Sequence, residues 1–273
     1  MLRKTSLPSL LFDRGLNSLA EFMRKRAVQK HRFTHICVPM DDVIGMRLFS
    51  TGSFEQTQLD GVLDYLDENP PEKDAIFLDV GGNIGVYSIL LRDYFSKIYT
   101  FEPNPVTYDI LKANIVLANV ANAKPVNLAL SNQSGEVPFY VPQNGNLGWA
   151  TLNGDHHTIP VDRTTITCMQ LDAFVAHEGI DPRRIGLIKI DVEGHEKNVI
   201  DGAEKTLVNS GIPLLFEVLN DVSGMQLIAV LEKLGYRQFN VFRRSIKLPF
   251  TATVERKKLD LSQTAKSALV LAL

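Results

Sequence analysis

The stretch 76–88, IFLDVGGNIGVYS, constrains the fold of this chain more than any other segment. It opens within the apolar run 75–78, whose length is typical of a buried strand. It leads into Val86, Ile89 and Leu90, which are spaced to line one face of a helix. The glycines between them tolerate positive φ and hold no side chain between a ligand and the backbone. The stretch therefore predicts a strand, a glycine turn and a helix whose first N–H groups are open to a ligand.

The spacing of the glycines separates two classes of ligand. A dinucleotide site needs G-x-G-x-x-G. Counted from Gly81, the second and third glycines would fall on Asn83 and Val86, so that pattern is absent. The sequence has D-x-G-x-N-x-G instead, which resembles the S-adenosylmethionine (SAM) turn of class I methyltransferases. SAM carries no pyrophosphate but has an ammonium and a carboxylate, so an acid at the strand end suits it. A glycine turn with no ligand is the alternative at this point.

The next strand adds a second feature. Residues 97–101, KIYTF, are followed by Glu102-Pro103-Asn104-Pro105. Glu102 lies about 20 residues beyond the first glycine, where an acid that ends the second strand reaches ribose hydroxyls. A carboxylate accepts hydrogen bonds from two neighbouring hydroxyls at once. Asn104 is then the expected N-cap of a helix, with Pro105 in its first turn.

Length and composition set the outer limits. The chain has 273 residues, 45% hydrophobic and 22% charged, which suits one large α/β domain with a small extension. The net charge of −2 gives no overall field that favours nucleic acid. The two cysteines, Cys37 and Cys168, show no C-x-x-C spacing, so a reduced cytoplasmic protein is expected. No apolar run reaches the roughly 20 residues of a membrane span.

The first 53 residues are predicted to be an N-terminal extension with a helix over about 16–30 and a hairpin over 33–49. Residues 1–32 hold eight basic and two acidic residues, a net charge of +6. The extension either braces or covers the main domain, or it makes a peripheral contact with an anionic membrane surface. The domain proper is expected to span residues 54–273.

Strands and helices alternate along the main domain, which predicts a mostly parallel sheet. The fold class expected is α/β, a Rossmann-like seven-stranded sheet with helices on both faces. Residues 247–263 are predicted to be irregular. Further strands are expected over 123–129, 135–141, 164–168, 185–190, 213–218, 237–242 and 268–273. Helices are expected over 54–66 and 225–234, with a short one that begins at 171 and another that follows the strand 185–190 and ends at about 208.

Three blocks together resemble the FkbM-type methyltransferase family: FLDVGGNIGVYS with FEPNP, then GNLGWATL, then LIKIDVEGHE with a glutamate-bearing strand after it. The resemblance covers about residues 54–219. It implies a class I SAM-dependent fold and methylation of oxygen on sugars, glycans or polyketide-like hydroxyls. Gly82 departs from the family, which more often has alanine there, and a small effect is expected. A SAM-binding module without activity is one alternative, and a methyltransferase acting on another acceptor such as nucleic acid is a weaker one, because no N-P-P-Y-type motif follows the fourth strand.

In an open α/β sheet, ligands bind outside the carboxyl ends of the strands. The ends of the first and fourth strands are therefore expected to bring Asp79, Gly81, Asn83, Asp191, Glu193 and His195 into one crevice. Lys189 is unusual in an apolar strand, and its expected partner is an acid of this crevice, unless its amine reaches solvent instead. The residues expected to bind the cofactor are Glu55, Asp79, Gly81, Gly82, Asn83, Ile84, Glu102, Pro103, Leu130, Ser131 and Asp191.

Methyl transfer needs an acceptor oxygen that is aligned with the methyl group and, for a sugar hydroxyl, a base within reach. The candidates are His195, Glu193 and Asp191. His195 titrates in the useful range, and the two acids are expected to raise its pKa. A helix-start or substrate-contact role is the alternative for His195, and contact with the SAM amino group is the expected role of Asp191. Asp191, Glu193 and Glu217 present oxygen ligands for Mg²⁺, but no metal is predicted because their spacing fixes no site. His156 and His157 fall on a loop, where solvation and a role in covering the substrate are both open.

The expected partner is a small-molecule or glycan substrate rather than nucleic acid, and the expected location is the cytoplasm, with membrane association left open. The sequence does not indicate the acceptor or the oligomeric state.

Overall fold

The computed structural model describes residues 36–39, 43–52, 54–143, 147–154, 159–219, 221–247, 251–260 and 267–273. Its centre is an eight-stranded sheet in the order β10-β9-β11-β8-β7-β1-β2-β3. The strands are β1 (Ile76–Val80), β2 (Lys97–Phe101), β3 (Ala123–Val126), β7 (Ile185–Ile190), β8 (Leu214–Leu219), β9 (Phe239–Lys247), β10 (Thr251–Lys258) and β11 (Ser267–Ala272). The expected mostly parallel sheet is confirmed.

The strand count is corrected from seven to eight. β10 lies in the stretch 247–263 that was predicted to be irregular, and it pairs antiparallel with β9 along its whole length. Its sequence, TATVERKK, holds several charged residues and gives no apolar run. An edge strand with charged side chains is common, because charge protects the open edge from pairing with another chain. The signal for β10 is therefore its partner β9 rather than its own composition.

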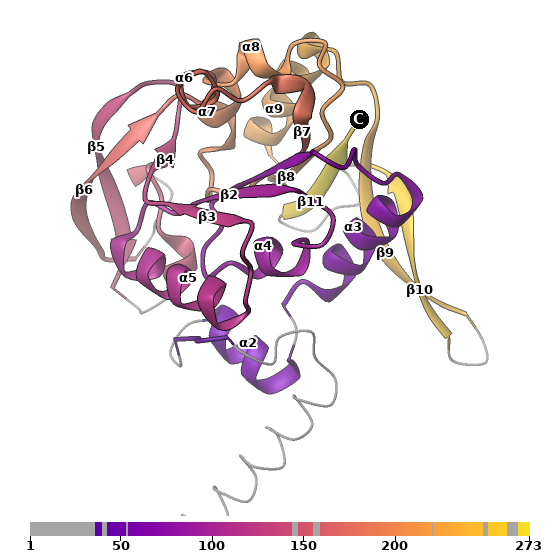
Figure 1. The fold of residues 1–273 in the computed structure, drawn as a ribbon, viewed down its shortest axis with the longest axis horizontal. Coiled ribbons are helices and arrows are strands. Elements are labelled where there is room, and N and C mark those ends of the chain that lie inside the picture. Colours follow the sequence, from indigo (N-terminus) through magenta and orange to yellow (C-terminus); the bar gives the residue numbers. More distant parts are fainter. Residues whose placement is uncertain are drawn as a thin grey trace, which may run out of the picture.

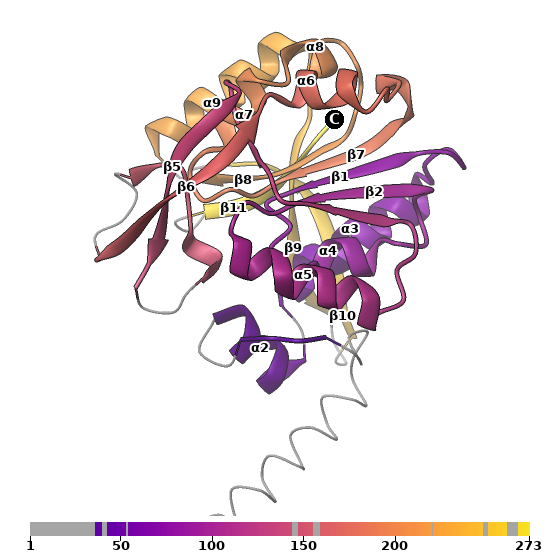
Figure 2. The same cartoon turned by 60° about the vertical axis from the view of Figure 1, so that its left-hand side comes forward.

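Helices cover both faces of the sheet, as expected. Figures 1 and 2 show α3, α4 and α5 on one side and α6 to α9 on the other. Their bounds are α3 (Gln56–Glu68), α4 (Val86–Leu90), α5 (Pro105–Leu117), α6 (Leu171–His177), α7 (Glu196–Asp201), α8 (Glu204–Leu207) and α9 (Val222–Leu234). Because both faces are covered, β1 is buried along its whole length and carries no alternation of apolar and polar residues. None of the helices in the described part of the chain is long and apolar enough to cross a membrane.

A second, three-stranded sheet in the order β4-β6-β5 stands beside the carboxyl ends of the main strands (Figure 2). Its members are β4 (Ala129–Leu130), β5 (Gly135–Pro142) and β6 (Val161–Met169), and the short helix η1 (Leu147–Trp149) follows β5. The single strand predicted over 123–129 is therefore two strands in different sheets. A proline at 125 and a polar residue at 127 lie where the chain leaves one sheet for the other.

The predicted hairpin over 33–49 is wrong where the structure describes it. Helix α2 (Val43–Thr51) occupies most of this range. Gly45 lets the helix approach the preceding segment, because a Cβ there would lie 1.9 Å from the Pro39 carbonyl oxygen. Leu48 joins the core cluster formed with α3 and α4, so this part of the predicted extension packs on the main domain. The helix predicted over 16–30 lies outside the described residues, and its brace or membrane role stays a prediction.

Candidate active site

The sheet reverses its order of connection between β1 and β7, which run parallel as neighbours. At such a switch point the loops after the two strands part and leave a crevice. Here the loops stay close at their base, since the Asp191 amide donates to the Val80 carbonyl at 3.1 Å. Gly81 has φ +73°, and a Cβ on it would lie 1.9 Å from the Asp191 carbonyl oxygen. Gly81 is therefore required by the backbone of the neighbouring loop as well as by any ligand.

Gly82 packs against the second strand. A Cβ at this position would lie 2.1 Å from Thr100 Cγ2, inside the buried layer beneath α4. The family's alanine therefore does not fit at this position of this chain, while the expectation that the glycine leaves cofactor binding intact stays a prediction. A β-branched residue at position 100 occupies the space that an alanine methyl group would need.

We expect Gly82→Ala to lower the free energy of unfolding by about 1–3 kcal/mol, the usual cost of overpacking a buried site. Thr100→Ser removes the clashing methyl group and keeps the hydroxyl that lies 2.6 Å from Ser88 Oγ. The double variant Gly82→Ala/Thr100→Ser should therefore recover most of the loss in denaturant unfolding. Strict additivity of the two single variants would contradict this account.

One part of the crevice is a slot with an acid at its edge. Glu102 Oε2 accepts from the Asn83 amide at 3.1 Å, and Oε1 accepts from the Asn104 amide at 2.8 Å. Burial raises the pKa of Glu102 to about 7. Each carboxylate oxygen has a second lone pair for a ligand hydroxyl. Apolar side chains and Pro103 line the rest of the slot, among them Phe101, Leu128, Leu130, Phe139 and Leu152.

His195 belongs to this slot. Its Nε2 lies 2.9 Å from the hydroxyl of Ser131, a buried residue behind the slot. Burial lowers the pKa of His195 to about 4. The expected upward shift is therefore wrong, because desolvation of the imidazolium outweighs the nearby acids. A histidine with so low a pKa is a weak base, and its Nε2 is already engaged with Ser131, so His195 is a poor choice for the proton acceptor.

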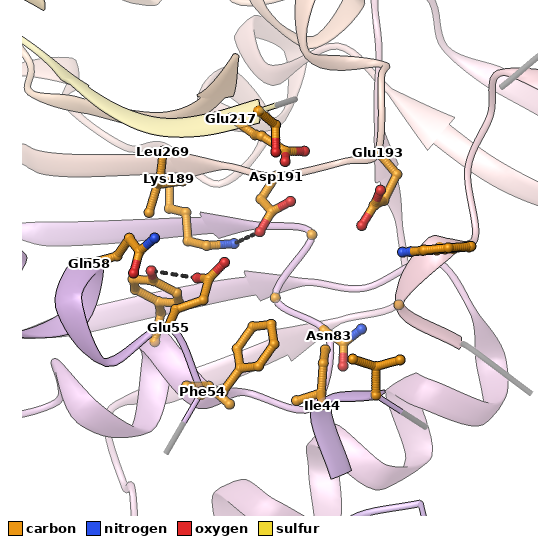
Figure 3. Close-up of a pocket in the computed structure, with 18 of the residues that line it drawn as sticks. Ile44, Phe54, Glu55, Gln58, Asn83, Lys189, Asp191, Glu193, Glu217 and Leu269 are labelled. Atoms are coloured by element: carbon orange, nitrogen blue, oxygen red, sulfur yellow. Dashed lines mark hydrogen bonds and ion pairs between the residues drawn. The ribbon is translucent and has the colours of Figure 1, made fainter. Parts of the chain in front are cut away.

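The other part of the crevice, here called the acidic cleft, is lined by Glu55, Asp191, Glu193 and Glu217 together with Lys189. Figure 3 shows these side chains converging from α3, β7 and β8, with Ile44 and Phe54 at the edge. Glu55 adopts φ 50°, a conformation uncommon outside glycine, and its Oε2 accepts from Tyr87 Oη at 2.9 Å. Burial and the nearby Asp191 raise the pKa of Glu55 to about 7.

Lys189 is paired with acids, as predicted. Its Nζ lies 3.1 Å from Asp191 Oδ2 and 3.9 Å from Asp79 Oδ1. It also lies 4.9 Å from the centre of the Tyr87 ring. The side chain is 3% exposed, so the alternative of a solvated amine is excluded. Although burial disfavours its charged form, the acids Asp191, Asp79 and Glu55 together raise the pKa of Lys189.

Three of the predicted cofactor residues do not line the crevice: Ser131, described above, Asp79 and Ile84. Asp79 is fully buried, and its Oδ2 accepts from Ser88 Oγ at 2.6 Å. It lies within β1, opposite Thr100 and Lys189, so its side chain points to a sheet face rather than past the strand end. Ile84 is 1% exposed and belongs to the core between α4 and the sheet. Asp79 therefore pairs with Lys189, and Ile84 contributes to core packing.

Glu193 lines both the slot and the acidic cleft. Its backbone has φ 53°, and its carbonyl accepts from Thr151 Oγ1 at 2.8 Å. Burial, followed by the charge of Asp191, raises the pKa of Glu193 to about 9. A carboxyl group with such a high pKa is a strong base once it is ionised. Of the three predicted candidates, Glu193 has the best position for a proton acceptor.

Glu196 and Thr151 are structural residues of the site that the sequence did not reveal. Glu196 Oε1 accepts from the amides of Val192 and Gly194, at 3.1 and 3.2 Å. An acid shortly after a glycine at the start of a helix is the signal that would have found it. Thr151 comes from the segment after η1, which no local pattern connects to the loop at 191–195.

The family model described as the methyltransferase FkbM domain matches residues 79–238, more than half of the chain. The chain belongs to the FkbM methyltransferase family. The resemblance predicted from the three sequence blocks is thereby confirmed, and the family supports SAM as the cofactor.

Curated FkbM-family relatives differ in what their names specify. Hexuronic acid methyltransferase AglP of Haloferax volcanii is 31% identical over 136 residues, which are 50% of this chain and 53% of that protein. The 31-O-demethyl-FK506 methyltransferase FkbM of Streptomyces tacrolimicus is 28% identical over 60% of this chain and 72% of its own length. A crystal structure of a methyltransferase FkbM from Methylobacillus flagellatus aligns with a TM-score of 0.44 at 12% identity, over 93% of this chain and 57% of that one. The chain spans about half the length of the archaeal relative.

The residues of this FkbM-family chain fit SAM. Glu102 has lone pairs left for ribose hydroxyls, the slot offers apolar walls for a flat ring, and the acidic cleft suits an ammonium and a sulfonium. Within the described ranges, no three His, Cys, Asp or Glu side chains are placed so that they could hold a metal ion. His156 and His157 lie outside those ranges, so their role stays a prediction.

Proposed function

We propose that this chain transfers a methyl group from SAM to a hydroxyl oxygen of a small-molecule or glycan acceptor. The observation that carries the proposal is the meeting of the ribose-type slot and the acidic cleft at Asp191 and Glu193. A ligand in the slot and a ligand in the cleft would be neighbours there. Bringing two reactants together in a fixed orientation supplies much of the rate of a displacement reaction.

Each residue then has a role toward the cofactor. Glu102 binds the ribose hydroxyls, and Pro103 and Leu130 contact the adenine side. Glu55 and Asp191 accept hydrogen bonds from the ammonium group. The bound cofactor would supply a methyl group on a positively charged sulfur. The carboxylates of the cleft favour a cation there, and the ion pair with Lys189 holds Asp191 in place.

Glu193 takes the proton from the acceptor hydroxyl in this proposal. A hydroxyl is a weak nucleophile and gains from a base within hydrogen-bond reach. A cationic cofactor in the same cleft favours the ionised carboxylate and lowers the pKa of Glu193 from its raised value. His195 holds the loop and the slot through Ser131 instead.

Two relatives support oxygen as the methylated atom. The name of the Streptomyces protein specifies a 31-O position, and the name of the Haloferax protein specifies a hexuronic acid, a hydroxylated sugar acid. The acid-lined cleft also disfavours the phosphate backbone of a nucleic acid, which is the alternative acceptor.

We expect Glu102→Ala to weaken SAM binding by about 1.5–3 kcal/mol, since it removes charged hydrogen bonds to ribose. Calorimetric titration of SAM measures the change. Glu204→Ala, at an exposed position on α8, is the matched control and should bind as the wild type does. Equal affinity of Glu102→Ala and wild type would place the ribose elsewhere.

The proposed function is tested by a methyl-transfer screen over sugars, sugar nucleotides, glycans and hydroxylated polyketides, with nucleic acids included, read by intact mass. A product 14 mass units heavier from a hydroxylated acceptor is expected. SAM binding without any product would favour the non-catalytic module. Loss of activity in EDTA that Mg²⁺ restores would overturn the prediction of a metal-free reaction.

A further inference from the structure

Four of the residues that line the acidic cleft, here grouped as one wall, have no role toward the cofactor. Trp149 comes from η1, Glu217 lies near the end of β8, and Ser267 and Leu269 belong to β11. In Figure 3, Glu217 and Leu269 lie on the side of Lys189 and Asp191 opposite Phe54 and Ile44. This wall, here called the acceptor wall, is the surface left for a second substrate.

The charges around the acceptor wall are one-sided. Among the described residues that line the cleft, Lys189 is the single basic side chain, and it is buried between Asp191 and Asp79. Burial and Asp191 raise the pKa of Glu217. An anionic group in the cleft would either face carboxylates or force them to take up further protons. Both outcomes cost free energy, whereas a neutral or cationic group avoids the cost.

Trp149 adds a flat apolar surface beside these acids. It is 47% exposed and is the one tryptophan in the sequence. The segment that carries it is fixed two residues later, where Thr151 pairs with Tyr140 through both backbone groups and donates to the Glu193 carbonyl. An indole held in this way presents a rigid apolar face to a ligand.

We propose that the acceptor is a sugar ring without a carboxylate or phosphate group, held with one face on the indole of Trp149 and with its hydroxyl or ammonium groups donating to Glu217. This assignment rests on the proposed function, because it concerns the second substrate of the same cleft. A sugar ring has an apolar face of C–H groups and a rim of hydroxyl donors, which match the indole and the carboxylate. An ammonium group on the ring would bind more tightly still.

The test uses matched methyl glycosides of the gluco, galacto and manno series, each as the neutral hexoside, the amino sugar and the uronide. Each is titrated into the full chain with S-adenosylhomocysteine present, by calorimetry and by the emission of Trp149. In at least one series, the neutral or amino member should bind about 10-fold or more tightly than the uronide.

Three variants make the test specific. Trp149→Leu should weaken the preferred glycoside by up to about 10-fold. Glu217→Lys should bind the uronide more tightly than the wild type does, because it supplies a cation on the acceptor wall. Glu217→Gln keeps the shape and should lose the advantage of the amino sugar over the neutral one, and it serves if Glu217→Lys does not fold.

The inference is overturned if the uronide binds as tightly as the neutral hexoside and the amino sugar in every series, or if no glycoside binds. It is also overturned if Trp149→Leu leaves the affinity for the preferred glycoside unchanged. Failure of the proposed function looks different, because SAM would then not bind or would yield no methylated product. SAM binding with methyl transfer to a uronide would remove the inference and leave the proposed function intact.

Discussion

Glu193→Gln is expected to lower kcat by about 10²–10⁴-fold with saturating SAM, the usual effect of removing a general base. Glutamine keeps the shape of the side chain but does not accept the proton. Because Glu193 lines both parts of the crevice, it lies where the two substrates meet. SAM affinity should change little, and this separates the effect from a loss of cofactor binding.

The pH profile distinguishes Glu193 from His195. A base works in its ionised form, so kcat/KM for SAM, which reports on the enzyme without bound cofactor, should rise as the pH increases toward the Glu193 pKa of about 9. If His195 were the base, with its pKa of about 4, kcat/KM would be level from pH 6 upward. His195→Gln is the control, since an amide can replace the hydrogen bond to Ser131 and should keep near-normal kcat. A strong loss in His195→Gln with an unaffected Glu193→Gln would reverse the two roles.

Lys189→Met should lower the free energy of unfolding by about 3–5 kcal/mol, because it leaves the buried Asp79 and the partly buried Asp191 without their cation. Lys189 is 3% exposed and Asp79 is fully buried. The double variant Lys189→Met/Asp79→Asn should recover part of this loss by removing one of the uncompensated charges. Denaturant unfolding measures both, and an unchanged stability of Lys189→Met would contradict the buried pairing.

The loss in Lys189→Met should depend on pH in a defined direction. Burial raises the pKa of Asp79 in the folded chain while the charge of Lys189 lowers it, so Lys189→Met should raise it further. A carboxyl group with a raised folded pKa favours the folded state below its ordinary pKa of about 4 and loses that contribution as the pH rises. The difference between Lys189→Met and wild type should therefore be small near pH 4 and grow toward pH 7.

The elements beside the crevice were predicted from their own sequences. β2 and β7 begin and end where the sequence analysis placed them, at 97–101 and 185–190, because strands buried on both faces are mostly apolar. Glu102 was placed by its distance from the glycine turn, and the turn itself holds it through the Asn83 amide. Local spacing was sufficient for these features.

Features that depend on distant neighbours were missed. The spacing of Asp79 fixed its strand but not the face to which it points, which depends on pairing with β2 and β7. The need for a glycine at position 82 depends on Thr100, which lies 18 positions later. The pKa of His195 depends on burial by other parts of the chain, and α2 and β10 depend on the segments against which they pack.

The central claim, that the crevice is a SAM site, is tested most directly by calorimetric titration of the full chain with SAM, S-adenosylhomocysteine and NAD. We expect one molecule of SAM or S-adenosylhomocysteine per chain and no binding of NAD, because the glycine turn lacks G-x-G-x-x-G. Binding of NAD with no binding of SAM or S-adenosylhomocysteine would contradict the assignment of the slot, the acidic cleft and the roles of Glu102 and Glu193.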